Sequence, residues 1–161
     1  MSGIYLLSGS NLPPREEWLA KAISFLQQHK VEVIQTSKIY QTAAWGFTEQ
    51  PHFLNQVIRV EFSGTPQALL AICQQIEEYC ERIRVQAWGP RTLDLDILYF
   101  NNEIVNTPQL TIPHAFIQFR RFALVPLVEI ADDFVHPVLK QTNRQLLQHC
   151  ADKLPVEEYT V

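Results

Sequence analysis

The sequence predicts an α+β protein in which helices pack on one face of an antiparallel sheet. Two observations favour this class: the spacing of the apolar residues and the order of the predicted elements. Short apolar or alternating runs, typical of strands, are interspersed with longer stretches whose apolar residues recur at helical spacing, in the order β-α-β-β-α-β with C-terminal additions. The length of 161 residues fits one core, so we expect residues 1–161 to form a single domain.

The first strand, helix and second strand are expected within residues 4–40. The apolar run at 4–7 ends in the turn residues 8–11, which indicates a strand followed by a turn. Two prolines followed by acidic residues then predict a helix that starts near residue 15 and ends near residues 29–30. The segment 31–40 is β-branched and partly alternating, so we expect one strand there.

The second half of the order follows a long loop. Residues 42–52 break the periodicity, and a loop of this length is more often functional than idle. Residues 53–62 alternate and predict a third strand, and residues 93–100 predict a fourth. Between them lies a helix opened by Gly64-Thr65-Pro66. Its apolar stripe comprises Leu69, Leu70, Cys73, Ile76, Cys80 and Ile83.

The C-terminal additions are expected to be shorter. Asn101-Asn102 predicts a two-residue hairpin turn into a short strand at 103–105. We expect one helix near 125–130, another at 141–151, and a loose tail after them.

Composition excludes several classes of protein. No two of the 5 glycines have the spacing of a dinucleotide turn or a phosphate loop, so bound phosphates would be held in another way. A net charge of −4 argues against a nucleic-acid binder, and no apolar run approaches the roughly 18 residues of a membrane span. The N-terminus lacks the features of a signal peptide, and the 3 cysteines have no zinc-site spacing. We therefore expect a cytoplasmic protein with free thiols that binds neither nucleic acid nor membrane.

Asp94 and Asp96 are the strongest candidates for chemistry. On a strand they face one way, roughly 6–7 Å apart, while Leu93, Leu95 and Ile97 face the other. Two such carboxylates repel each other unless a cation lies between them, and Mg²⁺ prefers oxygen ligands. The alternative is a solvated strand face with two aspartates that bind nothing.

Arginines flank these aspartates in the sequence. No lysine occurs between Lys38 and Lys140, whereas a generic surface would mix lysine and arginine. The planar guanidinium favours two-point contacts with phosphate, so Mg²⁺ and a polyphosphate are indicated. The alternative, that one or two of these arginines form structural ion pairs with Glu77, Glu78 or Glu81, remains open. The arginines concerned are Arg82, Arg84, Arg91, Arg120 and Arg121.

A ring-binding pocket is a further possibility. Trp45, Phe53 and Phe122 are candidates to line it, although each alone is more often a core or loop residue. Asn55 lies two residues after Phe53 on the same strand face and can offer a donor and an acceptor to a heterocycle. His114 either contacts a phosphate or is structural.

Taken together, these residues resemble those of the 6-hydroxymethyl-7,8-dihydropterin pyrophosphokinases of the folate pathway, and the resemblance extends nearly end to end. The most specific segment is residues 88–97, with its Gly-Pro-Arg-x-x-Asp-x-Asp core. Shorter matches carry the rest of the resemblance: Gly9-Ser10-Asn11, Tyr40-x-Thr42, Gly46, Phe53-Leu54-Asn55, Arg82-x-Arg84, Pro113-His114, Arg120-x-Phe122 and Pro126-Leu127.

The resemblance implies a ferredoxin-like fold and transfer of diphosphate from ATP to the pterin hydroxymethyl group, releasing AMP. It implies catalytic roles for Arg82, Arg91, Asp94 and Asp96, and two Mg²⁺ ions held by Asp94 and Asp96. The ATP-binding set would be Gln74, Glu77, Arg82, Arg84, Trp88, Arg91, Ile97, Thr111, His114 and Arg120. The pterin-binding set would be Thr42, Ala43, Trp45, Phe53, Asn55, Asp94 and Phe122. We expect a monomer with no attached folate-pathway domain.

Several positions depart from the usual family pattern, and two other classes of protein stay open. The departures are Ala43, Phe53, Ala87, Gln109 and Ala115. One alternative is a phosphohydrolase or γ-phosphoryl kinase that uses the same paired aspartates. The other is a non-catalytic ferredoxin-like module for nucleic acid, which predicts a basic, aromatic-studded sheet face.

Overall fold

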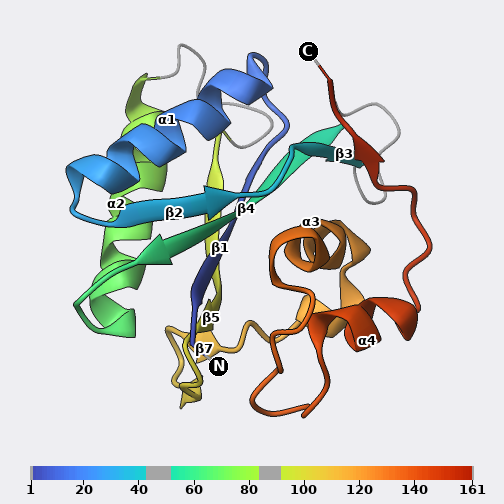
Figure 1. Ribbon diagram of the computed structural model, residues 1–161. Helices are drawn as coiled ribbons and strands as arrows, with labels where there is room; N and C mark the ends of the chain where they lie inside the picture. Colours follow the sequence, from blue (N-terminus) through green and yellow to red (C-terminus); the bar gives the residue numbers. More distant parts are fainter. Residues whose placement is uncertain (1, 43–51, 84–91, 161) are drawn as a thin grey trace.

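An antiparallel sheet lies at the centre of the computed structural model, with helices on both sides (Figure 1). The structure describes residues 2–42, 52–83 and 92–160. The helices are α1 (Arg15–Gln28), α2 (Pro66–Ile83), the 3-10 turn η1 (Ile117–Phe119), α3 (Arg121–Ala131) and α4 (Asn143–Gln148). The strands are β1 (Ile4–Ser10), β2 (Glu32–Thr36), β3 (Tyr40–Thr42), β4 (Phe53–Glu61), β5 (Asp94–Phe100), β6 (Val105–Asn106), β7 (Thr111–Ile112) and β8 (Glu157–Glu158).

The strand order in the main sheet is β5-β1-β4-β3-β8, and β2 also pairs with β4. Every pairing in the described part of the chain is antiparallel, as the sequence predicted. β1 lies between β4 and β5 and is buried along its whole length. Its position explains why residues 4–7 form a continuous apolar run, because both faces of the strand are covered.

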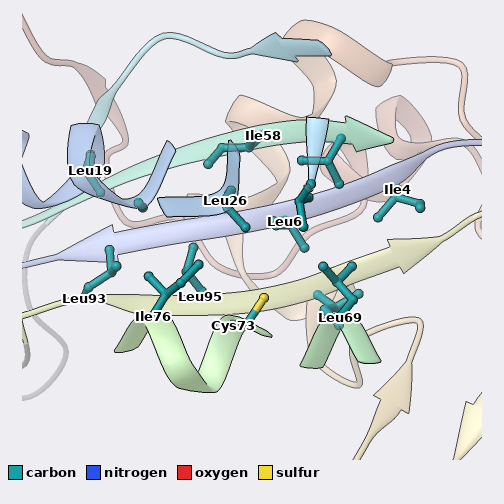
Figure 2. Packing of buried hydrophobic residues seen from close by; sticks show 14 of the residues in the cluster. Ile4, Leu6, Leu19, Leu26, Ile58, Leu69, Cys73, Ile76, Leu93 and Leu95 are labelled. Carbon is teal, nitrogen blue, oxygen red and sulfur yellow. The ribbon is translucent and has the colours of Figure 1, made fainter. Parts of the chain in front are cut away.

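The first hydrophobic core fills the space between the sheet and the helices α1 and α2. Leu6 of β1 packs there with Leu26 of α1 and Ile76 of α2 (Figure 2). The predicted stripe of α2 is largely confirmed, since Leu69, Cys73, Ile76 and Cys80 are buried and Leu70 packs against the cluster. Leu95 and Ile97 of β5 also point into this core, as their alternation predicted.

A second core covers the opposite face of the sheet. Tyr5 and Leu7, which alternate with Leu6 along β1, pack there with Leu124 of α3 and Leu146 of α4. A buried hydrogen bond from Tyr99 Oη to Asn143 Oδ1 (2.7 Å) joins β5 to α4. Hydrogen bonds of this kind stabilise a fold by about 1 kcal/mol net. The expectation that helices cover one face only is therefore wrong.

Residues 31–40 form two strands rather than one. Ser37 interrupts them: its side chain accepts a hydrogen bond from Val57 N (3.0 Å), and its own N–H donates to Val57 O (2.9 Å). The Ser37 hydroxyl thus accepts from the N–H of Val57 in β4, where regular pairing would use a backbone carbonyl. β2 therefore ends at Thr36, and the chain forms a separate strand, β3, from Tyr40. β1 is longer than expected, because residues 8–10 pair with β4, and Ser8 and Gly9 also pair with β5, instead of turning.

The predictions for the C-terminal additions need correction. Asn101 does lie in a turn, with a φ of 54°, but the following strand β6 pairs with β7 and not with β5. The tail is not loose, because β8 pairs with β3 and Tyr159 N donates to Ile39 O (2.8 Å). α3 begins earlier than predicted, at Arg121. α4 is shorter than predicted and begins at Asn143, directly after its N-cap Thr142, which forms a capping box with Gln145.

Candidate functional site

A cavity of about 500 Å³ opens on the second face of the sheet, beside α3. Its walls come from three adjacent strands, from β3, and from the segment that leads through η1 into α3. Residues far apart in the sequence therefore meet at one place. The lining residues are Leu7, Gly9, Thr42, Phe53, Asn55, Asp94, Asp96, Phe116, Phe119, Arg120 and Phe122.

The strand register places the polar residues of the floor in a row. Gly9 of β1 pairs with Asn55 of β4 on one side and with Asp94 of β5 on the other. Leu7, two residues earlier, pairs with Asp96. Asp94 and Asp96 therefore face the cavity together, both half-buried, as their spacing predicted.

Gly9 is the residue that lets this row form. A Cβ atom at position 9 would lie 2.5 Å from Asn55 Nδ2, which is closer than any side chain tolerates. The absent side chain leaves room for the Asn55 amide, which is buried and donates to Ser8 O at 3.3 Å. The backbone of β1 thus holds Asn55 in place at the cavity floor.

Aromatic rings form the cavity walls next to Asn55. Phe53 precedes Asn55 on the same face of β4 and pairs with the buried Thr42 of β3. Phe122 belongs to the first turn of α3 and reaches the same cavity from the side of that helix. A planar ring would find apolar surface on Phe53 and Phe122 and polar groups on Asn55 and Thr42.

Arg120 brings a positive charge to the cavity. Its guanidinium carbon lies 5.1 Å from the centre of the Phe116 ring and 5.6 Å from that of Phe122. Such cation–π contacts orient a guanidinium without neutralising it. The charge remains available to an anion in the cavity.

His114 lies close to the charged residues of the site. Its backbone N–H donates to Leu98 O (3.0 Å), and its Nδ1 accepts from Phe116 N (3.2 Å). Burial lowers the pKa of His114, Asp96 opposes this shift and Arg120 adds to it. The lowered pKa and the accepting role of Nδ1 both favour a neutral imidazole with its N–H at Nε2.

Two carboxylates of α2 secure the start of β5. Glu77 Oε2 accepts from Leu95 N (2.8 Å), and Glu81 Oε1 accepts from Thr92 Oγ1 (2.7 Å). These bonds fix the backbone on both sides of Asp94, so α2 holds the strand that carries the paired aspartates. Arg84 and Arg91, two of the arginines for which structural pairs with these glutamates were left open above, lie outside the described residues.

The cavity gathers part of the predicted site. Thr42, Phe53, Asn55, Asp94, Asp96, Arg120 and Phe122 line it. Gln74 and Arg82 are exposed on α2, Thr111 is exposed on β7, and Ile97 is buried in the first core. Ala43, Trp45, Arg84, Trp88 and Arg91 lie outside the described residues, as do Gly46 and Ala87.

Sequence reasoning did not single out three of the lining residues, Leu7, Phe116 and Phe119. Leu7 could have been found from its alternation with Gly9 on a strand whose two faces are both covered. Phe116 and Phe119 are half or more exposed, at 50% and 60%, and no apolar periodicity marks them. Their place at the cavity depends on the path of η1, which local sequence does not reveal.

The fold and the cavity together define a class of protein. An antiparallel sheet flanked by helices carries paired carboxylates, an arginine and aromatic walls around one opening. This combination is typical of an enzyme that brings a ring-containing substrate to a charged group.

Comparison with known proteins makes the class more specific. The profile described as 7,8-dihydro-6-hydroxymethylpterin-pyrophosphokinase matches residues 5–132. Proteins named 2-amino-4-hydroxy-6-hydroxymethyldihydropteridine pyrophosphokinase are similar to the chain. The relative from Bacillus subtilis is 45% identical over 127 residues, covering 78% of this chain and 76% of its own length. The relative from Haemophilus influenzae is 38% identical over 154 residues, covering 93% of this chain and 96% of its own length.

Solved structures share the fold. In the crystal structure of Plasmodium falciparum HPPK-DHPS wild type with pteroate, the match has a TM-score of 0.73 at 17% identity and covers 91% of this chain. The chain spans only 42% of that protein's length. The chain belongs to the 7,8-dihydro-6-hydroxymethylpterin-pyrophosphokinase family, which confirms the resemblance seen in the sequence.

Proposed function

We propose that the protein transfers a diphosphate group from ATP to the hydroxymethyl group of 6-hydroxymethyl-7,8-dihydropterin, a step of folate biosynthesis. A bond forms between the substrate oxygen and the β-phosphorus of ATP. The bond between the β-phosphorus and the oxygen that bridges it to the α-phosphorus breaks, AMP leaves, and the hydroxyl proton is released. The observation that carries the proposal is one cavity lined by aromatic side chains and by paired carboxylates, in a chain of this family.

The pterin would lie between Phe53 and Phe122, with its edge at Asn55 and Thr42. The cavity volume of about 500 Å³ lies within the range of small-molecule sites. Because Asn55 is held by Ser8 O and by the missing side chain at Gly9, its amide would meet the ring edge in one orientation. Ala43 and Trp45 belong to this proposed set by family resemblance alone.

Asp94 and Asp96 would hold two Mg²⁺ ions. The donor set fits, because both carboxylates face the cavity and Mg²⁺ usually takes one or two protein carboxylates together with phosphate oxygens and water. No group of three acidic, histidine or cysteine side chains in the described part of the chain offers a complete protein cage. When bound, the ions would neutralise charge on the phosphates.

The ATP phosphates would lie between the aspartates and the basic residues. Arg120 faces the cavity, and neutral His114 can donate from Nε2. Arg82 lies in the last turn of α2, which is the helix that holds the start of β5. Gln74, Glu77, Arg84, Trp88, Arg91, Ile97 and Thr111 complete the set by resemblance. Glu77 would also support the site through β5, given its bond to Leu95 N.

Product analysis separates this proposal from a phosphohydrolase or γ-phosphoryl kinase. The purified protein, incubated with ATP, Mg²⁺ and the pterin, should form AMP and pterin diphosphate in equal amounts. Release of AMP should require both the pterin and the metal ion. ADP or inorganic phosphate as the main product would contradict the proposal.

Three finer expectations belong to the proposal. The strand order β5-β1-β4 followed by β2 and β3 supports ferredoxin-like connectivity. The buried, free Cys73, Cys80 and Cys150 support a reducing, cytoplasmic location. No described helix is long and apolar enough to cross a membrane. We also expect a monomer, which sedimentation would test.

A further inference from the structure

Phe116 is an exposed aromatic residue that the proposed reaction does not use. Half of its surface, 50%, is exposed, so burial in the core does not explain it. It nevertheless lies at the cavity wall, with its ring 5.1 Å from the Arg120 guanidinium and 5.9 Å from the His114 ring. Phe116 therefore contacts two residues proposed to bind ATP.

The Arg120 guanidinium depends on aromatic rings for its orientation. No ion pair of Arg120 with an acidic residue occurs in the part of the chain that the structure describes. Its other ring contact, Phe122, lies at 5.6 Å on the pterin side of the cavity. Phe116 is thus the nearer of the two rings that contact the guanidinium.

The backbone fixes Phe116 relative to β5 and α3. The Phe116 N–H donates to His114 Nδ1, and His114 N–H donates to Leu98 O of β5. Further along, Arg120 N–H donates to Ile117 O, and Arg120 O accepts from Leu124 N at the start of α3. Both Phe116 and Arg120 are therefore anchored by their main chains, and only their side chains remain to be ordered.

We propose that Phe116 is a positioning residue for ATP, acting through Arg120. Its ring holds the guanidinium toward the cavity, so that less side-chain freedom is lost when a phosphate binds. The proposal rests on the function proposed above, because it takes ATP as the anion that Arg120 meets.

A double-mutant cycle tests it. In the otherwise unchanged protein, Phe116→Leu should raise the KM for ATP about 2- to 5-fold, the value of one exposed cation–π contact, with a smaller change in the KM for the pterin. Phe116→Tyr should restore the original KM for ATP. In an Arg120→Ala background, Phe116→Leu should change the KM for ATP no further.

Direct binding separates this proposal from the function itself. The Kd of the analogue α,β-methylene-ATP with Mg²⁺, measured by calorimetry, should follow the same pattern even if no pterin diphosphate is formed. Tyr79→Leu, at another half-exposed aromatic residue that packs on Phe25 of α1, should leave the Kd unchanged.

Two results would overturn the inference. One is an unchanged Kd in Phe116→Leu. The other is a rise of equal size in the presence and in the absence of Arg120, which would indicate a merely structural role. If Phe116→Leu lowers the Tm, Phe116→Met replaces it in the cycle. Absence of pterin diphosphate with normal analogue binding would contradict the proposed function and leave the inference standing.

Discussion

Gly9 lies between two residues of the cavity, Asn55 and Asp94, on the neighbouring strands. It pairs with Asn55 and Asp94 and provides the space into which the Asn55 amide fits. A glycine in the interior of a strand weakens the strand, so a specific close approach is the physical reason to have one there. Gly9 therefore marks the site by its close approach to Asn55, although the sequence has no glycine-rich phosphate loop.

Gly9→Ala should weaken pterin binding. The added Cβ would force the Asn55 amide to move, since the closest atom is the end of that flexible side chain, 2.5 Å away. We expect the KM for the pterin to rise about 3- to 10-fold, the value of one hydrogen bond, with less change in the KM for ATP. Asn55→Ala should match this effect, and adding Gly9→Ala to it should change little. A Gly9→Ala protein with an unchanged KM for the pterin would contradict the assigned role.

Asp94→Asn and Asp96→Asn should each abolish turnover while leaving the fold intact. Both side chains are half-buried at the cavity, where they contribute little to either core. Removing a ligand of the proposed metal ions should lower kcat at least about 100-fold, with a Tm within a few degrees of the original. Asp133→Asn, at an exposed carboxylate outside the cavity, is the matched control. Normal turnover in either variant would rule out the metal role.

Among the elements, those set by local pattern were predicted well and those set by distant partners were not. α2 matches its apolar stripe, and β5 carries Asp94 and Asp96 on one face as alternation requires. In contrast, the break between β2 and β3 depends on Ser37 bonding to Val57, 20 residues away. Local sequence cannot reveal such a partner.

The C-terminal strand is the clearest example of an element fixed from a distance. β8 pairs with Tyr40 and Gln41 of β3, and Arg15 of α1 lies 5.4 Å from the ring of Tyr159. Since β3 ends in Thr42 at the cavity, β8 supports one wall of the site from outside. A segment predicted to be loose thus belongs to the sheet.

A chain that stops after Leu154 should lose this support. We expect a Tm lower by several degrees, because the β3 edge and Tyr159 would lose their partners. The KM for the pterin should rise more than the KM for ATP, since Thr42 belongs to the proposed pterin-binding set. Val138→Ser, at a residue 52% exposed in the loop before α4, serves as a control for surface changes. Equal changes in both KM values would show that β8 stabilises the whole molecule instead.

The whole molecule has two cores separated by the sheet. Alternation along β1 predicts that residues such as Leu6 and Leu7 face opposite ways, but it does not say which helix covers each face. For that reason helices were expected on one side only. The second core leaves room beside α3 for the cavity, where Phe116 and Phe119 complete a wall that no sequence pattern marked.

The fate of the ATP phosphates tests the central claim most directly. Two parallel reactions, one with ATP labelled with ³²P at the β position and one with ATP labelled at the γ position, would be followed into the pterin product. Transfer of diphosphate predicts that both labels enter the pterin to the same extent and that AMP carries neither. Entry of the γ label alone, with the β label remaining in ADP, would contradict the proposed reaction.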